Sequence, residues 1–267
     1  MFGAVIGDIV GSTFEVENHR SIYFEMFRKD ARFTDDTVCT AAVADILNNY
    51  KGEQLTHENI SNSLRLWCCS HITRGFGSMF HQWVLNGVNR PYNSFGNGAL
   101  MRISPVAMFS KKNQINLEDS QTIAKKITEV THNHPQALKA VEMYNELLFY
   151  FLNNKVSSQL AKEKINETIL KYNYPNPISV ENYRLSIEFD LTCETSLNIC
   201  FAAILESDSF EEAIRNVISI GGDSDTYAAI TGALAEAIWG CDEFLPEIKK
   251  YFRQYDEQII KSISLLY

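Results

Sequence analysis

The 267-residue chain is 45% hydrophobic and 12% aromatic, which is enough for an extensive buried core. Its formal net charge at pH 7 is −9. Because nucleic-acid binding relies on clustered Lys and Arg, this charge argues against nucleic acid as a main partner.

The N-terminal sequence and the cysteines bear on location. The first apolar stretch is interrupted by Asp8 and follows no basic region, so we expect neither a signal peptide nor a membrane span. The six cysteines form no Cys-x-x-Cys pair and have no histidines at zinc-site spacing. We therefore expect reduced thiols, a cytoplasmic protein and no membrane partner.

The first predicted element is a buried helix at the N-terminus. Gly3, Gly7 and Gly11 recur every four residues within apolar sequence, a spacing that lets another helix approach closely. The polar residues that we assign to this helix, Asp8 and Glu15, must then find partners in the interior.

Further helices are predicted along the chain. Thr56 can cap one helix, Pro135 can begin a long one, and Ser209 with Glu212 has the pattern of a capping box. The stretch 172–190 contains two prolines and is predicted to be a loop or irregular segment.

Strand patterns are few, no linker divides the chain, and no internal repeat is convincing. We therefore predict an all-α fold with one domain over residues 1–267.

Two acidic clusters far apart in the sequence each precede a helical pattern. Residues 34–37 read Thr-Asp-Asp-Thr, and residues 221–226 read Gly-Gly-Asp-Ser-Asp-Thr. Such residues are ordinary helix caps, because their side-chain oxygens accept the unpaired first-turn amides. One cap needs one oxygen, however, whereas each cluster offers two carboxylates, and adjacent acids repel unless something binds them. Carboxylate and hydroxyl oxygens are the ligands that Mg²⁺ or Mn²⁺ prefers, so the leading hypothesis is a metal-centred hydrolase.

Five motifs occur in a recognisable order. They are Gly3–Glu15, Thr34–Thr37, Gly96–Arg102, Thr131–His132 and Gly221–Thr226. In this order the sequence resembles the ADP-ribosylglycohydrolase family from residue 3 to about residue 240. The resemblance implies a compact all-α fold with two Mg²⁺ or Mn²⁺ ions in a cleft that binds ADP-ribose.

The resemblance also implies roles for individual residues. Glu15 matches an acidic residue that sits at the metal centre and takes part in catalysis in the serine-directed branch of the family. The implied metal ligands are Thr34, Asp35, Asp36, Asp223, Asp225 and Thr226. The implied ligand-binding residues are Gly75, Phe76, Gly77 and Ser78 for the diphosphate, Ser94, Phe95, Gly96 and Asn97 in a second loop, and His132. Bare backbone amides at the glycines suit phosphate oxygens.

Each of these residues also has an ordinary structural interpretation. A glycine pair around an aromatic residue is usually a turn, His132 can be a hydrogen-bonded helix-start histidine, and Arg102 can pair with a buried acid. Residues 196–198 depart from the sequence usual in bacterial members, which leaves the acceptor side of the pocket open.

The expected reaction is hydrolysis at the anomeric carbon of the distal ribose, with a water activated at the metal ions. Glu15 is the first choice of general base, and Asp36 or Asp223 is the second. The substrate is expected to be an ADP-ribosylated protein or an ADP-ribose-containing small molecule. Two alternatives remain: a dinuclear metal hydrolase of another nucleotide or phosphoester, and a non-catalytic ADP-ribose-binding or structural protein. The second alternative predicts eroded metal ligands, whereas all the expected carboxylates are present.

Overall fold

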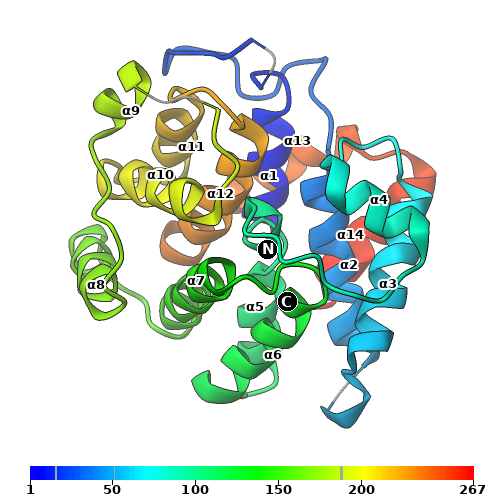
Figure 1. Cartoon of the computed structure of the whole chain (residues 1–267). Helices are drawn as coiled ribbons and strands as arrows, with labels where there is room; N and C mark the ends of the chain where they lie inside the picture. Colours follow the sequence, from blue (N-terminus) through cyan, green and yellow to red (C-terminus); the bar gives the residue numbers. More distant parts are fainter. Residues whose placement is uncertain (16, 51, 187–188) are drawn as a thin grey trace.

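Helices and the loops between them make up the computed structural model, which describes residues 1–15, 17–50, 52–186 and 189–267 (Figure 1). In these ranges the only β-type pairing is an isolated bridge between Gly96 and Thr192, so the predicted all-α fold is confirmed. The α-helices are α1 (Phe2–Gly11), α2 (Asp35–Asn49), α3 (His57–Ser70), α4 (Ser78–Asn86), α5 (Ser104–Lys112), α6 (Leu117–Glu129), α7 (Pro135–Asn153), α8 (Ser158–Lys171), α9 (Val180–Ser186), α10 (Cys193–Leu205), α11 (Phe210–Ile218), α12 (Ser224–Trp239), α13 (Leu245–Ile248) and α14 (Glu257–Ser264). No helix within the described ranges is both long and apolar enough to cross a membrane.

The glycine stripe of α1 packs directly on α12. A Cβ atom on Gly7 would lie 1.9 Å from the carbonyl oxygen of Ala228, and one on Gly11 would lie 2.5 Å from the Cα of Asp225. The two backbones are therefore in contact, as the four-residue glycine spacing predicted. This contact brings Asp8, on α1, close to the first turn of α12.

Helix α1 also contacts α2, and α2 contacts α12. In Figure 1, α7 to α12 gather on one side of α1, and α2 to α4 with α14 gather on the other. The two acidic clusters at the starts of α2 and α12 thus meet beside α1, although they are far apart in the sequence.

The predicted helix starts occur where expected. Thr34 and Thr56 are N-caps whose side-chain oxygens accept backbone N–H groups of Asp36 and Asn59. The capping box at Ser209 is only half formed: Ser209 Oγ accepts the N–H of Glu212, but the Glu212 carboxylate accepts the N–H of Asp208 instead.

Two local predictions need correction. The stretch 172–190 is not wholly irregular, because it contains the short helix α9; Ser179 Oγ accepts the N–H of Asn182 at its start, and Val180 is buried. Residues 187 and 188 lie outside the described ranges. Glu15 is not part of the first helix, because α1 ends at Gly11 and Glu15 lies in the following turn.

Candidate metal centre and ligand cavity

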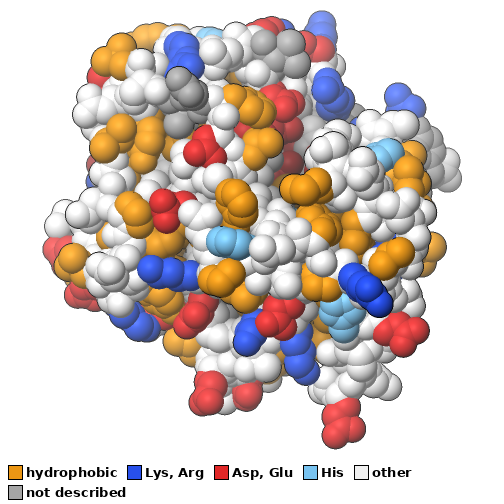
Figure 2. Space-filling model, viewed as in Figure 1, with side chains coloured by type: hydrophobic (Ala, Val, Ile, Leu, Met, Phe, Trp, Pro, Cys, Tyr) orange, Lys and Arg blue, Asp and Glu red, His pale blue; other side chains and the backbone are white. Residues whose placement is uncertain are grey.

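A cavity of about 650 Å³ opens between the N-termini of α2, α4 and α12 and the loop 92–98. Acidic side chains are recessed in a hollow of this face, with hydrophobic side chains around it (Figure 2). Of the residues expected from the sequence, the lining includes Glu15, Thr34, Asp35, Gly75, Gly77, Ser78, Ser94, Phe95, Gly96, Asn97, His132, Asp223, Asp225 and Thr226. The structure therefore gathers most of the candidate residues around one space.

Three buried carboxylates from three helices form a first group. Asp8, Asp36 and Asp225 each offer an oxygen, and these oxygens lie within 4.8 Å of one another. Asp8 is held rigidly: its Oδ2 accepts the N–H groups of Thr34 (2.9 Å) and Thr37 (3.1 Å). These bonds fix α1 against the first turn of α2.

A second group shares one member with the first. Glu15, Asp223 and Asp225 also bring carboxylate oxygens within 4.8 Å of one another. Asp223 is oriented by Asn97, whose Nδ2 donates to Asp223 Oδ2 at 2.6 Å. Because Asp225 belongs to both groups, the arrangement offers two adjacent carboxylate-lined positions joined by one bridging carboxylate.

The glycine pair before α12 makes this approach possible. Gly221 and Gly222 have φ of +79° and +73°, in the left-handed region that side chains other than glycine rarely adopt. The chain turns there to place Asp223 at the N-cap of α12 and Asp225 in its first turn. The N–H of Gly222 is held by Asn18 Oδ1 at 3.0 Å.

Asp36 and Asp225 have no paired cation among the described residues, so their ionised forms are disfavoured. Burial, and then the charge of Asp225, raises the pKa of Asp36 well above its usual value. Burial, with the charge of Asp223 next, does the same to the pKa of Asp225. Among the described residues no Lys or Arg forms an ion pair with either acid, and Asp36 Oδ1 is buried without a hydrogen-bond partner. A carboxylate cluster of this kind is the donor set that Mg²⁺ or Mn²⁺ binds.

Capping does not account for the surplus acids. Thr34, not an aspartate, caps α2, and Asp223 makes no side-chain cap bond at α12. The hydroxyl groups of Thr34 and Thr226 both lie 3.2 Å from Asp36 Oδ2. Asp36 is thus surrounded by hydroxyl and carboxylate oxygens, which are hard donors that a divalent cation could use.

Glu15 differs from the other acids in its exposure. It is half-buried in the cavity wall, and the charge of Asp225 is the main cause that raises its pKa, with burial second. The nearby Arg32, which also lines the cavity, acts in the opposite direction. A carboxylate that is both accessible and harder to ionise than usual is suited to exchange protons with a ligand.

The glycine loop before α4 presents backbone to the cavity. Gly75 has a φ of +105°, and a Cβ on it would lie 3.3 Å from Asp35 Oδ1. Gly77 is the N-cap of α4, and a Cβ on it would meet no atom within 4 Å. The first-turn amides of α4 therefore open toward the cavity without a side chain at Gly77 to cover them.

Two expected site residues do not line the cavity. Phe76 is buried, and its ring packs on that of Phe80, with centroids 5.6 Å apart. Asp36 lies beneath the cavity surface, within the first carboxylate group. Asp35 lines the cavity but joins neither carboxylate group.

The second loop is fastened to the start of α10. The N–H of Asn97 donates to the carbonyl of Leu191 at 2.7 Å, and the N–H of Cys193 donates to the carbonyl of Phe95 at 2.9 Å. Ser94 Oγ accepts the N–H of Gly96. These bonds hold Asn97 beside Asp223, while the Phe95 ring remains 43% exposed at the rim.

Asp8 is the important residue that the sequence reasoning did not place in the site. The signal was present, since a carboxylate predicted on a buried helix needs partners, but nothing in the sequence identified them. Pairing with a buried acid was the ordinary interpretation of Arg102. Among the described contacts its guanidinium meets Thr131, His132 and the Phe80 ring instead.

The fold and this site define an all-α protein with a buried carboxylate cluster at the edge of a ligand-sized cavity. A family model described as ADP-ribosylglycohydrolase matches residues 1–265. The ADP-ribosylarginine hydrolase Tri1 of Pseudomonas putida (strain GB-1) is 24% identical over 275 residues, covering 92% of this chain and 71% of that protein. The ADP-ribosyl-[dinitrogen reductase] glycohydrolase of Rhodospirillum rubrum is 25% identical over 264 residues, covering 90% of this chain and 84% of that protein.

A solved structure of an ADP-ribosylglycohydrolase-related protein complex has the same fold, with a TM-score of 0.73 at 19% identity over 99% of this chain and 94% of that one. The chain belongs to the ADP-ribosylglycohydrolase family. It is a glycohydrolase.

Proposed function

We propose that this protein is a dinuclear-metal-dependent hydrolase that cleaves the glycosidic bond between ADP-ribose and its acceptor. The observation that carries the proposal is the pair of carboxylate groups that share Asp225. Relatives named for ADP-ribosylarginine and for ADP-ribosyl-dinitrogen reductase support a protein side chain as the acceptor. A small molecule that carries ADP-ribose is the second candidate substrate.

Two Mg²⁺ or Mn²⁺ ions fit the donor set. Asp8, Asp36 and Asp225 would hold one ion, and Asp223 with Asp225 the other, beside which Glu15 would stay free to exchange a proton. The hydroxyl groups of Thr34 and Thr226, which contact Asp36, complete the oxygen-rich surroundings. When bound, such ions lower the pKa of a coordinated water and neutralise the charge of the cluster. Asp35 belongs to neither group, so it would face the bound ions from the cavity wall and not share in either carboxylate group.

The protein's own groups would orient ADP-ribose. The uncovered first-turn amides of α4, with Gly75 and Gly77, would bind the diphosphate, because helix N-termini favour anions. The loop 94–97 would line the opposite side, where Asn97 is fixed by its bond to Asp223. The distal ribose would then face the carboxylate groups.

Glu15 is the proposed general base. It lines the cavity. The charge of Asp225 and burial raise its pKa toward neutral pH, which suits a group that takes up a proton. Asp36 is less suited to this role, since it lies below the cavity surface. Asp223 remains the second choice, although its bond to Asn97 favours a ligand role. The negative field of the remaining carboxylates would favour the oxocarbenium-like transition state.

We further propose that the protein acts in the cytoplasm, with no nucleic acid or membrane as partner. The six cysteines are all unpaired thiols, which suits a reducing compartment. The net charge of −9 disfavours a polyanionic partner.

A release assay tests the function. Purified protein, stripped of metal by EDTA, is incubated with ADP-ribosyl-arginine, ADP-ribosyl-serine or O-acetyl-ADP-ribose, with and without Mg²⁺ or Mn²⁺. We expect free ADP-ribose from at least one substrate only when metal is present. The control variant Asp208→Asn removes an exposed carboxylate from an ion pair with Lys162 and should retain this activity. Release that is equally fast in EDTA would contradict the metal requirement, and no release from any substrate would contradict the activity.

A further inference from the structure

The buried guanidinium of Arg102 lies at the wall of the cavity without an acidic partner among the described residues. Its side chain is almost fully buried and lines the cavity. The Nη2 donates to Thr131 Oγ1 at 2.6 Å, whereas Nε has no hydrogen-bond partner. The guanidinium also contacts the Phe80 ring, 5.6 Å from Cζ, and the Cys39 thiol, but neither group supplies a counter-charge. Burying a cation without one is costly.

Thr131 connects Arg102 to His132 through its hydroxyl group. Its Oγ1 lies 2.8 Å from His132 Nδ1, and no further acceptor for the Thr131 hydroxyl occurs among the described contacts. Because arginine can only donate, Thr131 Oγ1 must accept from Arg102, and its single hydrogen is left for Nδ1. Nδ1 is therefore the acceptor of the Thr131 hydroxyl.

A second contact gives the same answer. Arg102 Nη2 itself lies 3.5 Å from His132 Nδ1. A hydrogen on Nδ1 would face both this cationic N–H donor and the Thr131 hydroxyl, whereas a lone pair there is attracted to both. Burial and the charge of Arg102 also lower the pKa of His132 well below its usual value, so the ring stays neutral at pH 7.

The remaining ring hydrogen must then be on Nε2. This atom is close to the loop 92–98. It lies 3.3 Å from the position that a Cβ on Gly98 would take and 3.9 Å from the corresponding position on Gly96. No described residue accepts a hydrogen bond from Nε2, and His132 is part of the cavity lining.

We infer that Arg102 and Thr131 are positioning residues that fix His132 as a neutral Nε2–H donor, which binds a hydrogen-bond acceptor atom of the ligand. The role of the donor toward ADP-ribose rests on the proposed function. The relay itself is a property of the free protein. It predicts that the site selects an oxygen or ring-nitrogen acceptor at this position and disfavours a ligand that presents a donor there.

Nitrogen-15 NMR of histidine-labelled, metal-free protein at pH 7 tests the relay without substrate. The His132 signals are assigned by their loss in His132→Gln. We expect the shift pattern of the neutral Nε2–H tautomer in the wild type. Thr131→Val should move the Nδ1 signal toward that of an imidazole nitrogen without a hydrogen-bond donor, because Nδ1 loses the hydroxyl of Thr131, and Thr131→Ser should restore the wild-type pattern. Thr128→Val is the matched control, because it removes another buried hydroxyl that bonds only to the carbonyl of Ala124.

Steady-state kinetics add the second measurement. Because one ligand hydrogen bond is weakened, Thr131→Val should raise KM roughly tenfold with a much smaller change in kcat, and Thr131→Ser should reverse this. An Nδ1–H or doubly protonated His132 in the wild type, or an Nδ1 chemical shift in Thr131→Val equal to that of the wild type, would overturn the relay. If the tautomer is as expected but no ADP-ribosyl bond is cleaved, the relay stands and the proposed function fails.

Discussion

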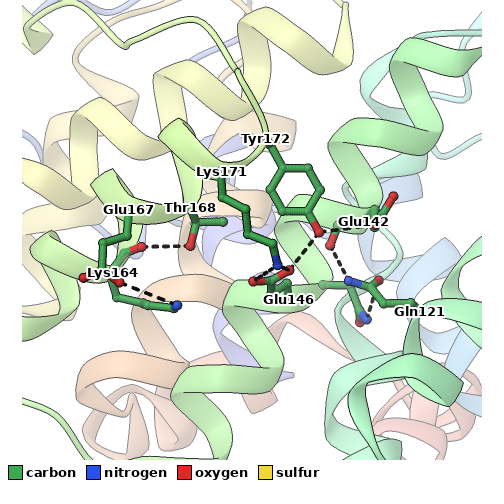
Figure 3. Close-up of polar contacts among 9 residues, drawn as sticks. Gln121, Glu142, Glu146, Lys164, Glu167, Thr168, Lys171 and Tyr172 are labelled. Carbon is green, nitrogen blue, oxygen red and sulfur yellow. Dashed lines mark hydrogen bonds and ion pairs between the residues drawn. The ribbon is translucent and has the colours of Figure 1, made fainter.

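Buried carboxylates occur in two regions of this molecule and are treated in opposite ways. Between α7 and α8, Glu146 is only 7% exposed, and both its oxygens accept from Lys171 Nζ at 2.7 and 2.6 Å (Figure 3). The hydroxyl of Tyr172 donates to the same carboxylate at 2.8 Å. This acid carries its own counter-ion and anchors the end of α8 to α7.

The carboxylates around Asp225 have no such cation in the described part of the chain. Asp8 and Asp36 instead receive hydroxyl and amide donors, and their neighbours are further acids. The comparison teaches that burial alone does not mark a functional acid. A buried acid with a paired lysine belongs to the packing of the fold, whereas a group of acids without one needs a cation from solution.

The sharpest test makes the same change in both regions. Asp225→Asn should lower metal-dependent turnover by about 10³-fold or more, because both carboxylate groups lose their shared member and several kcal/mol of charge stabilisation depend on the metal. The metal-free variant should nevertheless be more stable than the wild type by about 1–2 kcal/mol, since removing one charge relieves repulsion.

Glu146→Gln is the matched partner of that variant. It should destabilise the fold by about 1–3 kcal/mol, because a buried carboxylate loses its ion pair with the partly exposed Lys171, while turnover stays unchanged. Urea unfolding in EDTA and initial rates in Mn²⁺ measure both quantities. Equal stability changes of the same sign in the two variants would show that the contrast between the regions is wrong.

Glu15→Gln separates catalysis from binding. Loss of a general base should lower kcat by roughly 10²–10⁴-fold. The dissociation constant for ADP-ribose, measured by calorimetry, should change little, because the diphosphate-binding backbone is untouched. Glu17→Gln, an exposed neighbour that pairs with Arg28, is the control and should behave as the wild type. Full turnover by Glu15→Gln would remove Glu15 from its proposed role.

The pH dependence of stability sharpens the electrostatic side of the comparison. Burial raises the pKa of Asp223 to about 6 in the folded, metal-free protein. The unfolded chain loses this proton at lower pH than the folded one, so stability falls as pH rises from about 4 through 6. For Asp223 alone the free energy of unfolding should fall by roughly 3 kcal/mol over this pH range.

Asp223→Asn separates the effect of Asp223 on the free energy of unfolding from that of His132. The lowered pKa of His132 makes stability rise, not fall, as pH rises toward 6.5. In EDTA, the variant should gain stability relative to the wild type between pH 4 and pH 7, as measured by urea unfolding. A difference that is constant with pH would mean that Asp223 titrates normally in the folded protein.

The smallest expected effect concerns the glycine loop. Gly77→Val should weaken ADP-ribose binding about tenfold, because a branched side chain would cover the first-turn amides of α4, and Gly77→Ala should weaken it less. Neither change should affect thermal stability much, since a Cβ there meets no atom within 4 Å. AMP, which lacks the diphosphate, should bind all three proteins equally weakly. Unchanged ADP-ribose affinity in Gly77→Val would place the diphosphate elsewhere.

The sequence was sufficient wherever the deciding interaction is local. Thr34 and Thr56 cap helices with amides two and three residues away, and Pro135 begins α7 as predicted. Local patterns failed where a weak helix depends on tertiary support, as at α9, where burial of Val180 and its N–H bond to Glu206 hold a segment that its flanking prolines made look irregular.

The sequence by itself determined the all-α class, the glycine stripe of α1, the two acid-bearing helix starts and the family, because periodicity, capping and motif order can all be read from neighbouring residues. Only the tertiary structure decided that Asp8 joins Asp36, that Asp225 is common to both carboxylate groups, and that Phe76 lies outside the cavity. The physical reason is that convergence of side chains depends on backbone contact between distant helices. Here that contact is the close packing of α1 on α12, which the spacing of the glycines permits but whose partner it does not name.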